Sequence, residues 1–259
     1  MTCFRMVILL IGGQLLMTTL LAGLPSRVHE FAQVAEGGDA NLWMRTSILV
    51  RNHAMREANI TVKFFDDSGT AWEVKIGEDT ASTHTAKIPA DGMVKLMTAG
   101  QGAVLKAGWA TLTADREVSA QLFFEIFSAG KLTTQAAVEP VGSVRAAELF
   151  VDIDTAVGQR TALAVASLTS VAPVHVTVTL TDESGGNVWA GDLVVPPSGH
   201  VSKFVDEIIM DTQLEKYRGI VSLRSDGPIT VTALQQTGLI IGTLSALRRT
   251  LVARRGGEQ

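Results

Sequence analysis

The stretch GWATLTADREV, at residues 108–118, decides the fold, because a matching stretch, GIVSLRSDGPI, occurs at residues 219–229. Both stretches begin with glycine, alternate apolar with polar residues, and place an aspartate at the same position. Alternation with a period of two is typical of a β-strand with one buried face. The two stretches therefore predict the same β-structure twice in one chain.

Four further blocks recur in the same order, with small changes of offset between them. They are RTSILV (45–50) and RTALAV (160–165), DDSG (66–69) and DESG (182–185), Trp72 and Trp189, and IPADGMV (88–94) and VPPSGHV (195–201). Matches that keep their order indicate two copies of one domain. The shared residues are turn formers and strand formers, so architecture is repeated rather than chemistry.

The length of 259 residues exceeds the usual domain size of about 100–150 residues. The repeat divides the chain into expected domains at residues 30–140 and 147–250, and the short join between them predicts that they touch or hold a preferred angle. Apolar residues make up 46% and charged residues 19%, which argues against disorder. The net charge of −4 gives no electrostatic basis for binding nucleic acid.

Each copy contains about seven short runs of strand-forming residues separated by turns. We therefore expect an all-β fold: two tandem immunoglobulin-like antiparallel β-sandwich domains after an N-terminal signal segment. The clearest strand is VHVTVTL at residues 174–180. A hairpin is expected within residues 104–127, turning around Asp115, and a short helix within residues 202–211, with Ser202 as its cap.

Residues 1–24 form a targeting segment, in which Arg5 precedes an apolar run that ends in small residues. This order favours a cleaved signal peptide, and the alternative is an uncleaved membrane anchor. The only cysteine, Cys3, lies inside the segment, so the mature chain would have no disulfide. We expect an exported protein, either extracellular or in the periplasm or cell envelope.

Several motifs taken together resemble a known class of protein. They are an Arg-Thr strand, the sequence FFDDSG, an Ile-Pro-x-x-Gly turn, and GWAxLTADRxV. The pattern resembles the tandem immunoglobulin-like repeats of uncharacterised secreted bacterial proteins. The resemblance covers nearly all of the chain after the signal and implies an exported, non-catalytic two-domain module. It supplies no catalytic residues.

The residues themselves predict no catalytic site and no cofactor. The five histidines show no metal-binding spacing, and we expect them on the surface or on strand faces. The sequence PSGH at residues 197–200 suggests a hydrolase, but ADGM fills the same turn at residues 90–93 without serine or histidine. The acidic pairs before Ser-Gly are interpreted as turn caps. This leaves Asp152 and Asp154 as calcium candidates.

Trp72 and Trp189 are the candidates for ligand binding, because a pair of tryptophans could form a carbohydrate platform. Their equivalence in the two copies favours a packing role instead. The expected function is a non-catalytic structural or interaction module, with a protein or a cell-surface polymer as partner. The alternative is a module that binds carbohydrate or another ligand. Contact with a membrane is expected only through the N-terminal segment, if it is not cleaved.

Overall fold

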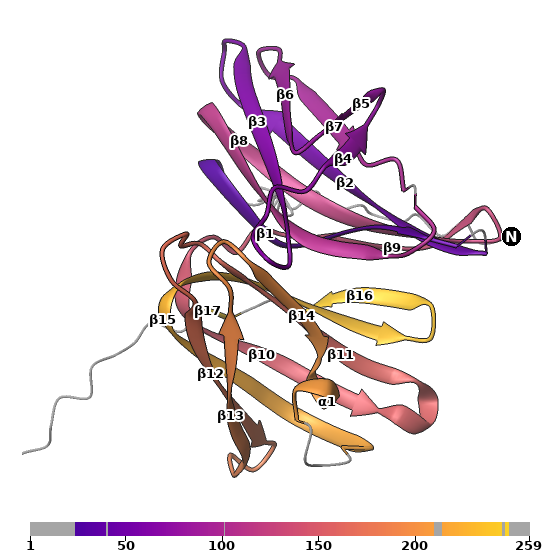
Figure 1. Cartoon of the computed structure of the whole chain (residues 1–259), viewed down its shortest axis with the longest axis vertical. Coiled ribbons are helices and arrows are strands. Elements are labelled where there is room, and N and C mark those ends of the chain that lie inside the picture. Colours follow the sequence, from indigo (N-terminus) through magenta and orange to yellow (C-terminus); the bar gives the residue numbers. More distant parts are fainter. Residues whose placement is uncertain (1–23, 40, 101, 210–213, 245–246, 249–259) are drawn as a thin grey trace, which may run out of the picture.

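The computed structural model describes residues 24–39, 41–100, 102–209, 214–244 and 247–248. Its all-β architecture confirms the predicted class: two separate antiparallel sheets, each curled on itself, lie one above the other (Figure 1). No helix among the described residues is long and apolar enough to cross a membrane. The predicted signal segment lies outside the described residues.

The first sheet runs in the order β6-β3-β8-β1-β2-β7, and β9 pairs with β8. The short strands β4 (Val74–Ile76) and β5 (Asp79–Ala81) pair with each other beside it. The strands of the first sheet are β1 (Ser26–Gly38), β2 (Leu42–Asn52), β3 (Ala58–Asp66), β6 (Thr83–Ile88), β7 (Met93–Met97), β8 (Lys106–Ser128) and β9 (Lys131–Val138).

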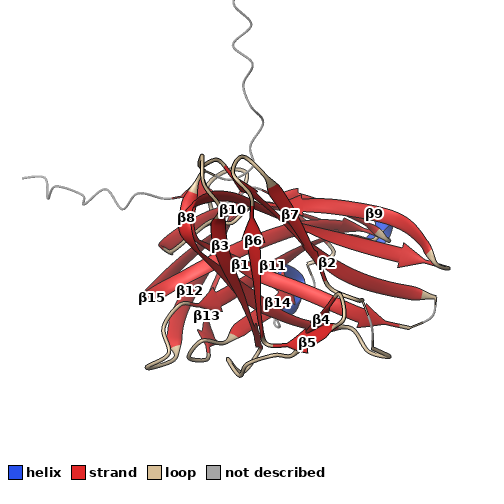
Figure 2. Cartoon of the chain, turned by 90° about the horizontal axis from the view of Figure 1, so that it is seen from above, coloured by secondary structure: helices blue, strands red, loops and turns tan. Residues whose placement is uncertain are grey.

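The second sheet runs in the order β13-β12-β15-β10-β11-β14, with β16 on β15 and β17 on β10. In this order, the six strands take the same positions as β6, β3, β8, β1, β2 and β7 in the first sheet. Figure 2 shows the strands of both sheets from above. The strands are β10 (Val144–Asp154), β11 (Gln159–Ser167), β12 (Val174–Asp182), β13 (Asn187–Val195), β14 (His200–Phe204), β15 (Lys216–Thr237), β16 (Ile240–Leu244) and β17 (Leu247–Arg248).

Each sheet encloses an apolar core made from the alternating residues of its strands. In β12, Val174, Val176, Val178 and Leu180 are all buried, as the period-two pattern predicts. Burying one such side chain stabilises the fold by roughly 1.5–3 kcal/mol. The predicted inward residues of β8 and β15 are also buried: Ala110, Leu112, Val118, Val221, Leu223 and Ile229.

The hairpin predicted around Asp115 is wrong, because β8 is one continuous strand. Opposite β1, its register slips so that Ser26 pairs with Val118 while Val28 pairs with Thr113. The extra residues form a bulge, which bends a strand and lets it pass from one part of a sheet to another. Before the bulge β8 pairs with β3, and after it with β2 and β9.

Asp115 stabilises this bend across strands rather than inside a turn. Its carboxylate accepts hydrogen bonds from the backbone N–H (2.9 Å) and the side-chain amide (2.7 Å) of Asn59 on β3. In the second sheet, Asp226 accepts from the N–H of His175 at 3.0 Å, and β15 is likewise continuous. The aspartates at the repeated position therefore fix the same bend twice.

The repeated Arg-Thr pair also has a structural role. The hydroxyl of Thr46 donates to the carbonyl of Ala35 at 2.8 Å and accepts from its N–H at 3.0 Å. Thr161 makes the same two bonds to Asp152, at 3.2 and 3.1 Å. Each threonine thus bridges the first and second strands of its sheet.

The lead-in before residue 39 is a full strand, β1, with Phe31 and Val34 buried. The predicted helix is shorter than expected, because α1 covers Val205–Ile208. Ser202 belongs to β14 and does not cap it; instead Glu207 accepts a hydrogen bond from the N–H of Phe204 at 3.2 Å. The apolar residues at helical spacing begin with Phe204, which is the last residue of strand β14. Over so short a segment, this spacing does not distinguish a strand that leads into one helical turn from a longer helix.

Candidate functional site at the junction of the two sheets

The two sheets meet through a small apolar cluster that belongs to neither core. Trp109 and Ala32 of the first sheet pack against Ala164 and Ala166 of β11. Phe65 stacks on the indole of Trp109, with ring centroids 4.7 Å apart. An aromatic surface set against alanines allows close approach of the two backbones, so the sheets are in direct contact, as the short join predicts.

A turn of the second sheet, Pro196–His200, is hydrogen-bonded to the first sheet. The indole N–H of Trp109 donates to the carbonyl of Ser198 at 2.7 Å. The backbone N–H of His200 donates to the carbonyl of Asp67 at 3.0 Å. A Cβ added to Gly69 would lie 2.2 Å from the carbonyl oxygen of Pro197, so the two segments touch backbone to backbone.

The imidazole of His200 is fully buried and bonded at both nitrogens. Nδ1 lies 2.7 Å from the Asp67 carboxylate and Nε2 lies 2.8 Å from the side-chain carbonyl oxygen of Gln33. A serine hydrolase also places a carboxylate on Nδ1, but its Nε2 must face the nucleophilic hydroxyl. Here Gln33 occupies Nε2, so the pair links the two sheets instead of activating a serine.

The backbone of Ser198 supports the same conclusion. Its φ of 51° is unusual for a residue other than glycine, and a strained serine can mark a nucleophile elbow. Asp91, at the corresponding position of the first sheet, has a φ of 52°. The unusual φ therefore belongs to this type of turn and not to a catalytic serine.

A second contact joins the sheets at the strands β9 and β16. The N–H of Ile241 donates to the hydroxyl of Thr134 at 3.4 Å, and Thr243 donates to the carbonyl of Ala137. The side chain of Ile241 is buried in the core of the first sheet, and Leu234 packs against the same core. The second sheet thus contributes residues to the first core.

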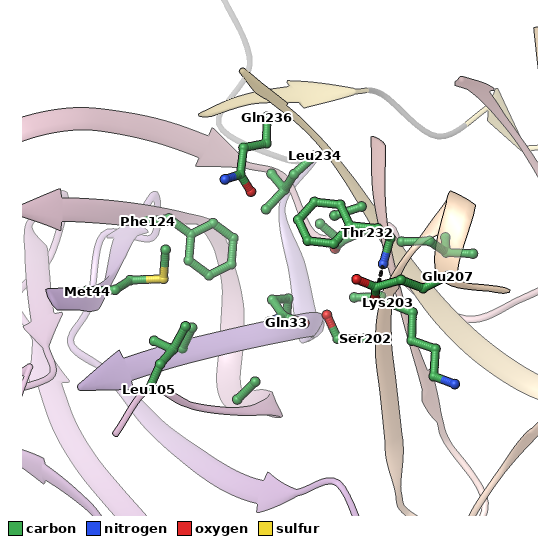
Figure 3. A pocket seen from close by; sticks show the side chains of 16 residues that line it. Gln33, Met44, Leu105, Phe124, Ser202, Lys203, Glu207, Thr232, Leu234 and Gln236 are labelled. Carbon is green, nitrogen blue, oxygen red and sulfur yellow. Dashed lines mark hydrogen bonds between the residues drawn. The ribbon is translucent and has the colours of Figure 1, made fainter. Parts of the chain in front are cut away.

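Between these two contacts lies a pocket of about 230 Å³. Figure 3 shows Met44 and Phe124 of the first sheet, with Leu105 from the segment before β8, on one side and Ser202 and Lys203 of the second sheet on the other. Most of its wall is apolar, with a few polar groups at the edge, which is the usual character of a small-molecule site. The further polar side chains around it are Gln33, Glu207, Thr232 and Gln236.

One edge of the pocket is held by Arg160. Its guanidinium lies 3.7 Å above the ring of Phe204 and pairs with Asp206 at 2.6 Å and Glu207 at 2.9 Å. Burial by itself would lower the pKa of Arg160, but the hydrogen bonds that its guanidinium donates to these carboxylates outweigh burial and raise the pKa. The helix α1 is therefore fixed to β11, and Glu207 is already engaged on both oxygens.

The candidate tryptophans pack in or against the cores of their own sheets. Trp72 is 8% exposed and belongs to the core of the first sheet. Trp189 is half-buried, lies opposite Leu180, and packs against the core of the second sheet. Little of the Trp72 ring is left to stack on a sugar, and the placement of both residues favours the packing interpretation.

The calcium candidates form ion pairs across strands. The carboxylate of Asp152 lies 3.1 Å from the guanidinium of Arg218, and that of Asp154 lies 3.0 Å from the ammonium of Lys216. A calcium site requires six or more oxygen ligands. Within the described ranges, no cluster of three or more histidine, cysteine or acidic side chains could hold a metal ion.

Three of the histidines, His29, His84 and His200, lie in strands, and their side chains are buried. Each has a partner that offsets the loss of water, such as the carbonyl of Val118, which lies 2.8 Å from Nε2 of His29. The junction residues themselves were not predicted. The sequence feature that could have indicated them is that Trp109 and His200 differ from their counterparts in the other copy, Ile220 and Met93.

No protein-family profile matches this chain, and no curated protein matches it.

Proposed function

We propose that this protein is an exported, non-catalytic interaction module, built from two immunoglobulin-like sheets that are joined into one body and present strand faces and turns to a protein or cell-surface polymer. One observation carries the proposal: His200, Asp67 and Ser198, the residues that most resemble catalytic groups, are used to join the sheets. The resemblance to secreted immunoglobulin-like repeats and the apolar segment at residues 6–24 support export.

The test follows the protein in a bacterial host that expresses the full chain. We expect it in the exported fraction, with an N-terminus between residues 23 and 26, because β1 begins at Ser26 and contributes Phe31 to the core. Full-length protein found only in the inner membrane would favour the anchor instead. Hydrolase activity lost in both Ser198→Ala and His200→Gln would overturn the non-catalytic interpretation.

The pocket supports a second candidate function, the binding of a small apolar ligand. A cavity of about 150 Å³ is enough to hold benzene, and this pocket measures about 230 Å³. The probe is benzene, titrated against the folded chain and followed by NMR. Binding that Leu105→Trp abolishes would support the pocket, since Leu105 is exposed at its edge and tolerates a larger ring. Shifts unaffected by this change would contradict it.

A further inference from the structure

The same turn is covered in one sheet and open in the other. Gly69 and Gly185 occupy it with φ of 86° and 85°. In both turns an aspartate accepts hydrogen bonds from the N–H and hydroxyl of the serine two residues later. A Cβ on Gly69 would meet Pro197 at 2.2 Å, whereas one on Gly185 would meet nothing within 4 Å. The second turn therefore has room for a docked segment.

The open turn continues into an apolar surface. On the first sheet, Phe65 pairs with Trp109 beside the covered turn; on the second, Thr181 pairs with Ile220. Phe150, on β10, lies opposite Ile220 and is 57% exposed. We call Phe150, Thr181, Ile220 and the turn at residues 182–186 the open platform. It is the counterpart of the surface that the first sheet uses at the junction.

The matching element is exposed on the first sheet. In the docked turn, the N–H of Gly199 donates to the carbonyl of Pro196 at 2.8 Å. In the corresponding turn at residues 89–93, Gly92 donates to Pro89 at 3.0 Å. Met93, the counterpart of His200, is 61% exposed. We call residues 89–93 the exposed turn; its backbone has the shape that the junction already accepts.

Size and charge are complementary in this second pairing. The junction sets Trp109 against Ala166. On the open platform, Ile220 takes the place of the larger Trp109. Beside the exposed turn, Arg51 takes the place of the smaller Ala166, so the side-chain volume lost on the platform is regained beside the turn. The Arg51 side chain is about half exposed and pairs with Asp91 of the exposed turn at 2.7 Å. Glu183, the counterpart of Asp67, is exposed and would offer Arg51 a second carboxylate.

We propose that the exposed turn of one molecule docks on the open platform of a second copy of the chain, repeating between molecules the contact that joins the two sheets within one. This rests on the proposed function as an interaction module and names its partner. The two surfaces are different and lie on different sheets. The contact is therefore heterologous, and it extends head to tail into open strings instead of closing as a symmetric dimer.

The experiment measures molar mass by light scattering across a concentration series of the chain starting at residue 24. The variants are Phe150→Asp on the platform and Met93→Asp on the turn, both at exposed side chains. Val157→Asp is the control, because Val157 is 61% exposed and lies in neither surface. We expect the wild-type chain and the control to grow beyond dimers as concentration rises, and each of the other variants to remain monomeric.

Mixing the two variants gives the sharpest result. Phe150→Asp retains an intact turn and Met93→Asp an intact platform, so an equimolar mixture should form dimers and stop there. This outcome also shows that both variants are folded. A wild-type chain that stays monomeric up to about 1 mM, or a mixture that does not dimerise, overturns the proposal. Export and hydrolase activity are measured in separate experiments. The molar-mass result therefore tests the docking proposal alone and does not decide the proposed function.

Discussion

Gly69→Ala and Gly185→Ala form a matched pair of substitutions that isolates the junction. The two glycines have the same φ within a degree and the same aspartate-capped turn. An L-residue in this left-handed region costs roughly 1–2 kcal/mol, and this term is common to both variants. Only the Gly69 variant also places a Cβ against the other sheet.

The size of the additional effect follows from the distances. The new Cβ would have to move from 2.2 Å to at least 3.0 Å from the Pro197 oxygen, because shorter Cβ contacts are essentially never observed. This movement separates Ser198 from the indole of Trp109 and the N–H of His200 from Asp67. Each lost hydrogen bond costs about 0.5–1.5 kcal/mol. Gly69→Ala should therefore destabilise the chain by about 1–3 kcal/mol more than Gly185→Ala.

The assay is equilibrium unfolding in urea, followed by circular dichroism at a concentration where the chain is monomeric. We expect the Gly69 variant to unfold at lower urea and, since the junction couples the sheets, to show two transitions or a smaller slope. If the free energies of unfolding of the two variants agree within about 0.5 kcal/mol, the range of an ordinary surface substitution, the junction does not stabilise the molecule as described.

Three further predictions use the same measurement. Burial is the main cause that lowers the pKa of His29 below its ordinary 6.5. The stability that the neutral imidazole contributes is therefore complete above pH 6.5 and is lost as the pH falls. His29→Gln should reduce the loss of folding stability between about pH 7 and about pH 5. Burial raises the pKa of Glu36 above 4.5, and its Oε2 has no hydrogen-bond partner among the residues that the structure describes. Its contribution is therefore complete below pH 4.5 and lost as the pH rises, and Glu36→Gln should stabilise the chain at pH 7 but not at pH 4; unchanged stability at pH 7 would contradict this. Leu112→Ala and Leu223→Ala, both in buried cores, should each cost about 2–5 kcal/mol, and a loss below 1 kcal/mol would argue against the assigned packing.

The strands and their buried faces could be predicted because the alternation of residue types is a local property. Val176 and Val178 are buried for the reason that the sequence shows directly, the period of two. The bend at Asp115 could not be predicted in the same way. An aspartate followed by charged residues has the composition of a turn, and its true partner, Asn59, is distant in sequence.

The repeat pattern does not predict the candidate site, because His200 has a different residue, Met93, as its counterpart. A junction between two copies joins unlike surfaces, a platform from one and a turn from the other. It therefore needs Trp109 only in the first copy and His200 only in the second.

It follows that the departures from the repeat carry the information about assembly, while the repeated residues specify the fold. Trp109 and Ile220 occupy the same place in their sheets, but only Trp109 has an indole N–H, and this N–H satisfies the carbonyl of Ser198. The second sheet has no such donor at Ile220, so it would hold a docked turn by apolar packing and an ion pair in place of this hydrogen bond. It leaves Phe150 exposed beside a turn with open space at Gly185. The differences therefore distinguish a contact that is completed within the molecule from one whose two halves lie on separate sheets.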